Sequence, residues 1–105
     1  MSIVDNCILS FNILEDDERI SEVNSFFIPD IEKPFVSVDA DFLPIGWYGG
    51  NKFLETPLFI AAFNHFREAD FVEHLKTIDW REPEEVQLII KRQYEDKFSI
   101  VEISK

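Results

Sequence analysis

The sequence has few of the residues that form covalent cross-links, metal sites and nucleophilic centres. Among 105 residues there are one cysteine, Cys7, two histidines and three glycines. A lone cysteine cannot form an intramolecular disulfide, so we expect a cytoplasmic setting. So few Cys and His side chains make catalysis or metal binding by these residues unfavoured, and we predict neither a metal nor another cofactor.

Long apolar runs and export signals are also missing. No stretch approaches the roughly 18 apolar residues that a membrane-spanning helix needs. The first residues, MSIVDNCILSF, contain no basic region and no small-residue cleavage site. We therefore expect no signal peptide and no membrane segment.

Basic residues are scarce as well. Ten Lys and Arg stand against 21 Asp and Glu, which gives a net charge of −11. Nucleic acids and anionic membranes are bound largely through Lys and Arg, so both are poor partners for this chain. A basic protein partner is favoured instead, because complementary fields steer encounter. The simpler interpretation is that the acidity only keeps the protein in solution.

Apolar residues, in contrast, are plentiful. They make up 46% of the chain and include 11 Phe, which is enough for one packed core. At this length we predict a single domain over residues 1–105.

Apolar periodicity predicts seven elements along the chain. Alternation places Cys7, Leu9, Phe11 and Ile13 on one face of the first strand. A helix begins at the four acids Glu15 to Glu18, with Asp as its N-cap, and a later helix has Phe71, Leu75 and Ile78 on its inner side. The expected strands cover residues 3–14, 35–38, 58–66, 86–93 and 98–103, and the expected helices run from the acids at 15–18 to about residue 27 and over about residues 67–78.

The order of these elements is β-α-β-β-α-β with one further strand at the C-terminal end. It resembles the ferredoxin-like, split β-α-β arrangement, in which an antiparallel sheet carries both helices on one face. We therefore expect an α+β, two-layer sandwich with an added strand. This fold serves many unrelated functions, so the resemblance implies none.

Two regions are candidates for a binding surface. Trp47 and Tyr48 lie within a stretch that contains all three glycines, and large aromatic residues in a loop supply rigid contact area. The alternative is that these rings fold back over the core as a lid. The other region is the acid-rich part of residues 15–41, for which we expect partner contacts from Asp16, Asp17, Glu18, Glu22, Asp39 and Asp41.

Individual side chains give little indication of catalysis or metal binding. Cys7 and His65 could form a dyad if the first and third predicted strands are neighbours, although the position of Cys7 on an apolar face favours a buried, structural thiol. We expect His65 and His74 to be surface or hydrogen-bonded residues. The acids at 15–18 and the pair Asp39 and Asp41 could bind a metal ion, but neither has a metal-ligand spacing.

The sequence thus favours a small protein-interaction domain over an enzyme. A specific form is an immunity- or inhibitor-type protein that covers a basic partner; the chain is similar to such proteins in size and charge only. One alternative is a homodimer formed through the side of the sheet that the helices leave uncovered. Another is a small-molecule site or enzyme that uses the loop Gly46–Asn51, near His65.

Overall fold

A computed structural model describes residues 4–29, 32–38 and 57–103. The chain is an α+β protein in which all the expected elements occur in the expected order. The strands are β1 (Val4–Ser10), β2 (Val36–Ser37), β3 (Leu58–Asn64), β4 (Gln87–Lys91) and β5 (Ser99–Glu102). The helices are α1 (Glu18–Asn24), α2 (Glu68–Thr77) and the short 3-10 helix η2 (Pro83–Glu85).

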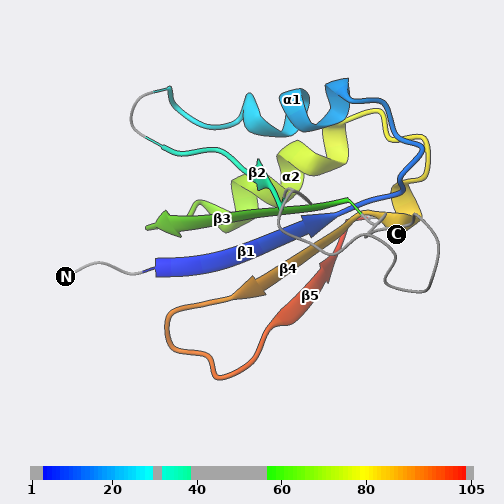
Figure 1. The fold of residues 1–105 in the computed structure, drawn as a ribbon. Coiled ribbons are helices and arrows are strands. Elements are labelled where there is room, and N and C mark those ends of the chain that lie inside the picture. The colour runs from blue at the N-terminus through cyan, green and yellow to red at the C-terminus, as the bar shows by residue number, and fades with distance from the viewer. Residues whose placement is uncertain (1–3, 30–31, 39–56, 104–105) are drawn as a thin grey trace.

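The five strands form one sheet in the order β2-β3-β1-β4-β5, and every neighbouring pair is antiparallel. Both α-helices lie on the same face of this sheet (Figure 1). Among the described residues no helix has the length and apolar character needed to cross a membrane.

The core lies between the helices and the sheet. Leu9, Leu88 and Ile90 on the sheet and Phe71 and Leu75 on α2 are fully buried, as period-2 and helical spacing predicted. Phe71 is the centre of an aromatic cluster, with ring contacts to Phe26, Phe27, Phe35 and Phe66. Burying one such side chain stabilises the fold by about 1.5–3 kcal/mol.

The opposite face of the sheet, here called the open face, is the side away from α1 and α2, and none of the described residues forms an α-helix on it (Figure 1). Strand register aligns five aliphatic residues across it, one from each strand, and we call this set the aliphatic row. The row consists of Val36, Ile60, Ile8, Ile89 and Ile100. Val36, Ile60 and Ile100 are 57%, 45% and 58% exposed, so this face is unusually apolar for a surface in contact with water.

The first strand is shorter than predicted. It ends at Ser10 because the Asn12 side chain accepts a hydrogen bond from the Leu14 backbone N–H (2.7 Å) and the Asn12 carbonyl accepts one from Glu15 (3.1 Å). This local turn replaces pairing in the sheet. Ile13, which we had placed with Cys7 and Leu9 on the buried face, is therefore 56% exposed.

The first helix is also shorter than predicted. It ends at Asn24, and Phe26 and Phe27 follow in turns whose N–H groups bond to Val23 and Asn24. Asp17 occupies the N-cap position, but its side chain makes no capping hydrogen bond.

Candidate functional site

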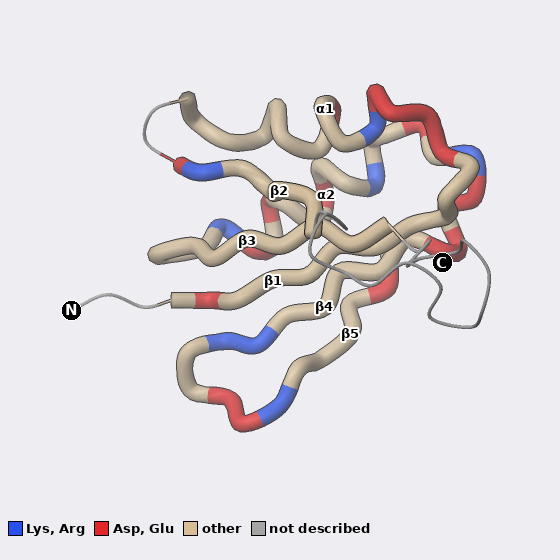
Figure 2. The backbone as a smooth tube through the Cα atoms, in the orientation of Figure 1, with Lys and Arg blue, Asp and Glu red and all other residues tan. Residues whose placement is uncertain are grey.

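Two acidic segments that are distant in sequence meet at one end of the sheet. The chain that leaves β1 carries the acids of residues 15–18, and η2, which leads into β4, carries those of residues 82–85. Because β1 and β4 are antiparallel neighbours, the exit of one strand lies beside the entry of the other. Figure 2 shows both acidic segments at this end of the molecule.

Glu15 ties the two segments together. Its side chain is 8% exposed, and its Oε1 and Oε2 accept hydrogen bonds from the backbone N–H groups of Arg81 (2.9 Å) and Glu82 (2.7 Å). A carboxylate that accepts two backbone donors forms strong, charge-assisted bonds. Glu15 is therefore a structural clamp, and it orients the exposed acids on either side.

The surface around this clamp, here called the acidic end, consists of Asp16, Asp17, Glu18, Glu82, Glu84 and Glu85. All are exposed except Glu82, which is half-buried. Two arginines stand nearby: Arg81 approaches Asp16 at 3.8 Å, and Arg19 approaches Asp16 at 3.7 Å and Glu22 at 2.6 Å. Carboxylates remain in excess, so the acidic end attracts cations.

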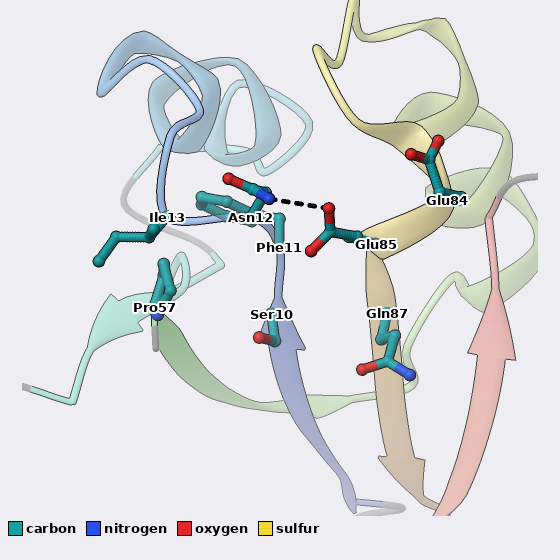
Figure 3. A pocket seen from close by; sticks show the side chains of 8 residues that line it. All are labelled: Ser10, Phe11, Asn12, Ile13, Pro57, Glu84, Glu85 and Gln87. Atoms are coloured by element: carbon teal, nitrogen blue, oxygen red, sulfur yellow. Dashed lines mark hydrogen bonds between the residues drawn. The ribbon is translucent and has the colours of Figure 1, made fainter. Parts of the chain in front are cut away.

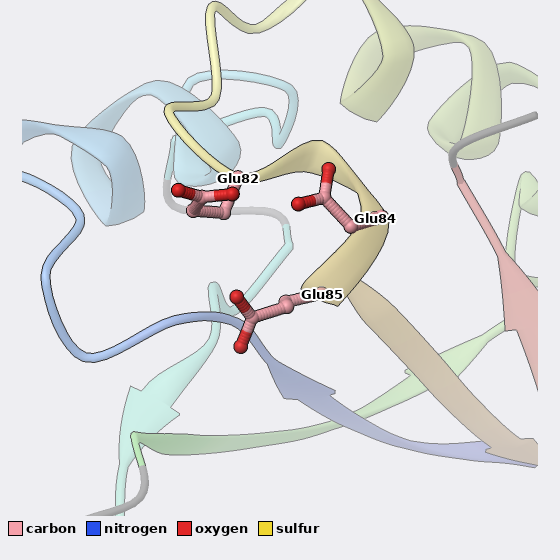
Figure 4. Close-up of side chains that lie close together, drawn as sticks. All are labelled: Glu82, Glu84 and Glu85. Atoms are coloured by element: carbon pink, nitrogen blue, oxygen red, sulfur yellow. The ribbon is translucent and has the colours of Figure 1, made fainter.

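Glu82, Glu84 and Glu85 form the tightest group of acids. Each offers a carboxylate oxygen within 4.8 Å of the other two (Figure 4). A hydrogen bond from Glu82 to Glu84 and the neighbouring negative charge raise the pKa of Glu82, and the same hydrogen bond lowers the pKa of Glu84. These oxygens are hard ligands of the kind that Ca²⁺ and Mg²⁺ prefer, although Ca²⁺ takes about six to eight of them.

A hollow of about 510 Å³ opens beside the acidic end. Phe11 and Ile13 contribute apolar lining, and Glu84, Glu85 and Gln87 contribute polar lining. The Asn12 amide donates to Glu85 Oε2 at 2.8 Å across it (Figure 3). A carboxylate in such a hollow suits the head of a Lys or Arg side chain, whose aliphatic stem packs on apolar surface.

The predicted site residues lie in different parts of the structure, and some of them are outside the described residues. Asp16, Asp17 and Glu18 lie at the acidic end, whereas Glu22 lies on α1 and pairs with Arg19. Asp39, Asp41, Trp47, Tyr48 and the loop Gly46–Asn51 lie outside the described residues. Glu82, Glu84 and Glu85 were not among the predicted site residues; their close spacing on both sides of Pro83 was the available signal.

The dyad of Cys7 with His65 is not formed. Cys7 pairs with Ala61 in the sheet and is 2% exposed, whereas His65 follows the end of β3 and is exposed. Four residues of strand, roughly 13 Å, separate His65 from the level of Cys7. Burial and the charges of Asp5 and Glu68 raise the pKa of the Cys7 thiol to about 12, so the thiolate that nucleophilic attack requires is disfavoured.

His74 has a structural environment. Its Nε2 lies 2.7 Å from the Glu22 carbonyl oxygen, and its ring packs against Phe26 and Phe71. This contact joins α2 to α1 and agrees with the hydrogen-bonded role expected for this residue.

Comparison with known proteins yields no match. No family model, no curated protein and no solved structure matches the chain. Any function must therefore be argued from the surfaces described above.

Proposed function

We propose that the chain is a non-catalytic protein-interaction domain that binds a basic partner through the acidic end, as immunity- and inhibitor-type proteins do. The observation that carries this proposal is the Glu15 clamp. It brings two acidic segments from opposite halves of the chain to one place, beside a hollow. The net charge of −11 supports the same choice of partner.

The contact we propose is an insertion of one cationic side chain. A Lys or Arg of the partner enters the hollow, where its stem lies against Phe11 and Ile13 and its head approaches Glu84 and Glu85. The surrounding acids steer the approach and raise the association rate. The remaining contacts of the partner fall on Asp16, Asp17 and Glu18.

The same reasoning favours binding over catalysis. Cys7 is buried, His65 is exposed at a strand end and His74 packs against aromatic rings. A small-molecule site near Trp47, Tyr48 and His65 was the alternative, and no contact among the described residues favours it.

We also propose that the fold is a ferredoxin-like sandwich extended by β5. Support comes from the antiparallel order β2-β3-β1-β4-β5, in which β3 lies between β1 and β2. A split β-α-β unit requires that placement of a third strand. The fold is a common host of unrelated functions, so this assignment adds no functional argument.

The proposal is tested by affinity capture with two charge-matched variants. Glu84→Gln/Glu85→Gln removes two charges from the acidic end, and Asp70→Asn/Glu73→Gln removes two exposed charges from α2. We expect the wild-type protein and the α2 variant to recover the same basic protein from a lysate of the source cells. The acidic-end variant should recover it at least tenfold less efficiently, since desolvated charge pairs carry most of the specificity.

Two results would contradict the proposal. One is equal recovery by both double variants, which would make the acidic end irrelevant to binding. The other is a captured partner that has no basic surface.

A further inference from the structure

The open face presents an apolar surface that the acidic end does not explain. The aliphatic row crosses all five strands, and Phe98, just before β5, is 48% exposed beside it. A hollow of about 580 Å³ adjoins the row, lined mostly by apolar residues that include Ala62, Pro34 and Phe98. In an antiparallel sheet with one face in water, these positions are normally polar.

The apolar character of this surface matches the centre of a protein interface. Four large apolar side chains, those of Val36, Ile60, Ile100 and Phe98, are each 45–58% exposed on this one face. The buried centre of a protein interface is likewise mainly apolar, and large exposed apolar patches on a monomer are often functional. The aligned rows of two such sheets can pack face to face at a spacing of about 10 Å.

The charges on the open face favour a second copy of this chain as its binding partner. Strand register places Lys91 on β4 two residues to one side of the row, and Glu102 on β5 two residues to the other side. Lys33 also borders the hollow. Among the described residues, the open face therefore carries no excess of acids, and two copies that meet through it do not repel each other as two acidic ends would.

A two-fold axis along the row makes the two charges complementary. Rotation about this axis places the row of one copy against the row of the other. It also brings the Lys91 side of one copy over the Glu102 side of the other. Each Lys91 then lies on the side where the other copy has Glu102. Such isologous, self-complementary contacts are the usual basis of homodimers.

We propose that the chain forms a homodimer through its open face, with the aliphatic rows packed against each other and Lys91 of each copy directed toward Glu102 of the other. The interface leaves the acidic end outside it, because that end lies at the exit of β1 and at η2, beyond the row. The proposal therefore stands independently of the basic partner.

Sedimentation equilibrium at tens of micromolar protein tests the dimer. The wild-type chain should sediment at twice its mass of 12.4 kDa. Ile100→Lys places a charge in the row and should give a monomer, whereas Leu14→Lys places the same charge on a side chain of comparable exposure, 67%, outside the open face and should remain a dimer. Circular dichroism checks that both variants fold.

A charge-exchange series tests the orientation. Lys91→Glu or Glu102→Lys alone turns two attractive contacts into repulsive ones and should raise the dimer dissociation constant about tenfold. The double variant restores attraction and should return the constant close to the wild-type value.

Each other outcome overturns a stated part of the proposal. A wild-type monomer at these concentrations would rule out the dimer. If Ile100→Lys then also failed to capture the basic partner, the open face would be assigned to that partner and not to a second copy of the chain. A dimer that Ile100→Lys and Leu14→Lys affect equally would place the interface elsewhere. Additive effects of the two charge changes would rule out the two-fold axis along the row.

Discussion

Glu15 has more influence on the structure than its position in a run of four acids suggests. Its neighbours Asp16, Asp17 and Glu18 are exposed, whereas Glu15 is buried and accepts two backbone hydrogen bonds from the segment before η2. Loss of a buried acceptor leaves both N–H donors without a partner, which is more costly than loss of an exposed contact.

We therefore expect Glu15→Ala to lower the free energy of unfolding by about 2–3 kcal/mol. Asp17→Ala, which removes an exposed acid without a capping bond, should change it by less than ~0.5 kcal/mol. Urea denaturation measures both. Equal effects of the two substitutions would show that Glu15 is not a clamp.

Cys7 provides a second prediction at the scale of the residue. With its pKa raised to about 12 by burial, the thiol is protonated near pH 8, and the core covers it. Iodoacetamide should modify the protein at pH 8 only after urea unfolds it, because thiolate is the reactive form. Mass spectrometry measures the modification, and labelling of the folded protein at the rate of a small free thiol would contradict the assignment.

At the scale of the element, a side-chain pair holds the edge strand β2. The Asn24 side chain accepts a hydrogen bond from the Phe35 N–H (2.9 Å) and donates one to the Phe35 carbonyl (3.1 Å). This two-way contact joins the end of α1 to a strand of only two residues. Phe35 itself is buried against Phe27 and Phe71.

Asn24→Ala should therefore loosen β2 and leave the rest of the sheet protected. The backbone amide of Val38, which donates to Leu58, should exchange with deuterium at least tenfold faster, because local opening governs exchange. Ser25→Ala, whose hydroxyl bonds only within the end of the helix, is the control. Unchanged exchange at Val38 in Asn24→Ala would mean that the sheet alone holds β2.

The sequence predicted the presence of the helices and strands more accurately than it predicted their ends. Helical spacing identified Phe71, Leu75 and Ile78 as the buried side of the second helix, and period-2 alternation did the same for Cys7 and Leu9 on β1. The end of β1 was missed because the Asn12 turn competes with strand pairing through a side-chain hydrogen bond. That competition depends on local geometry and not on hydrophobic pattern.

The candidate site was predictable only in part. Asp16, Asp17 and Glu18 were identified from their charge, but their meeting with Glu82, Glu84 and Glu85 depends on strand order and on the Glu15 contact across 66 and 67 residues. The aliphatic row required the strand register, because a shift of one residue exchanges the two faces of a strand. The alternation within residues 98–103 does not say which side of the strand faces away from the helices; the register places Ile100 on the open face.

At the scale of the whole molecule, the acidic end and the open face are two distinct surfaces, and each suits a different kind of contact. Acidic residues accumulate at the end of the sheet that holds η2 (Figure 2), and the exposed residues of the aliphatic row lie on the face away from α1 and α2 (Figure 1). An acidic surface favours a basic partner through long-range steering, and an apolar row favours a close, desolvated contact. We expect one contact to depend strongly on salt and the other to depend on it weakly.

The salt dependence of partner binding is the most direct test of the central proposal. We expect the dissociation constant of the captured basic partner to rise at least tenfold between about 50 and about 500 mM NaCl, because salt screens charge pairs at a surface. The slope should be shallower for Glu84→Gln/Glu85→Gln than for Asp70→Asn/Glu73→Gln. A dissociation constant that does not change with salt would contradict the assignment of the acidic end as the binding surface.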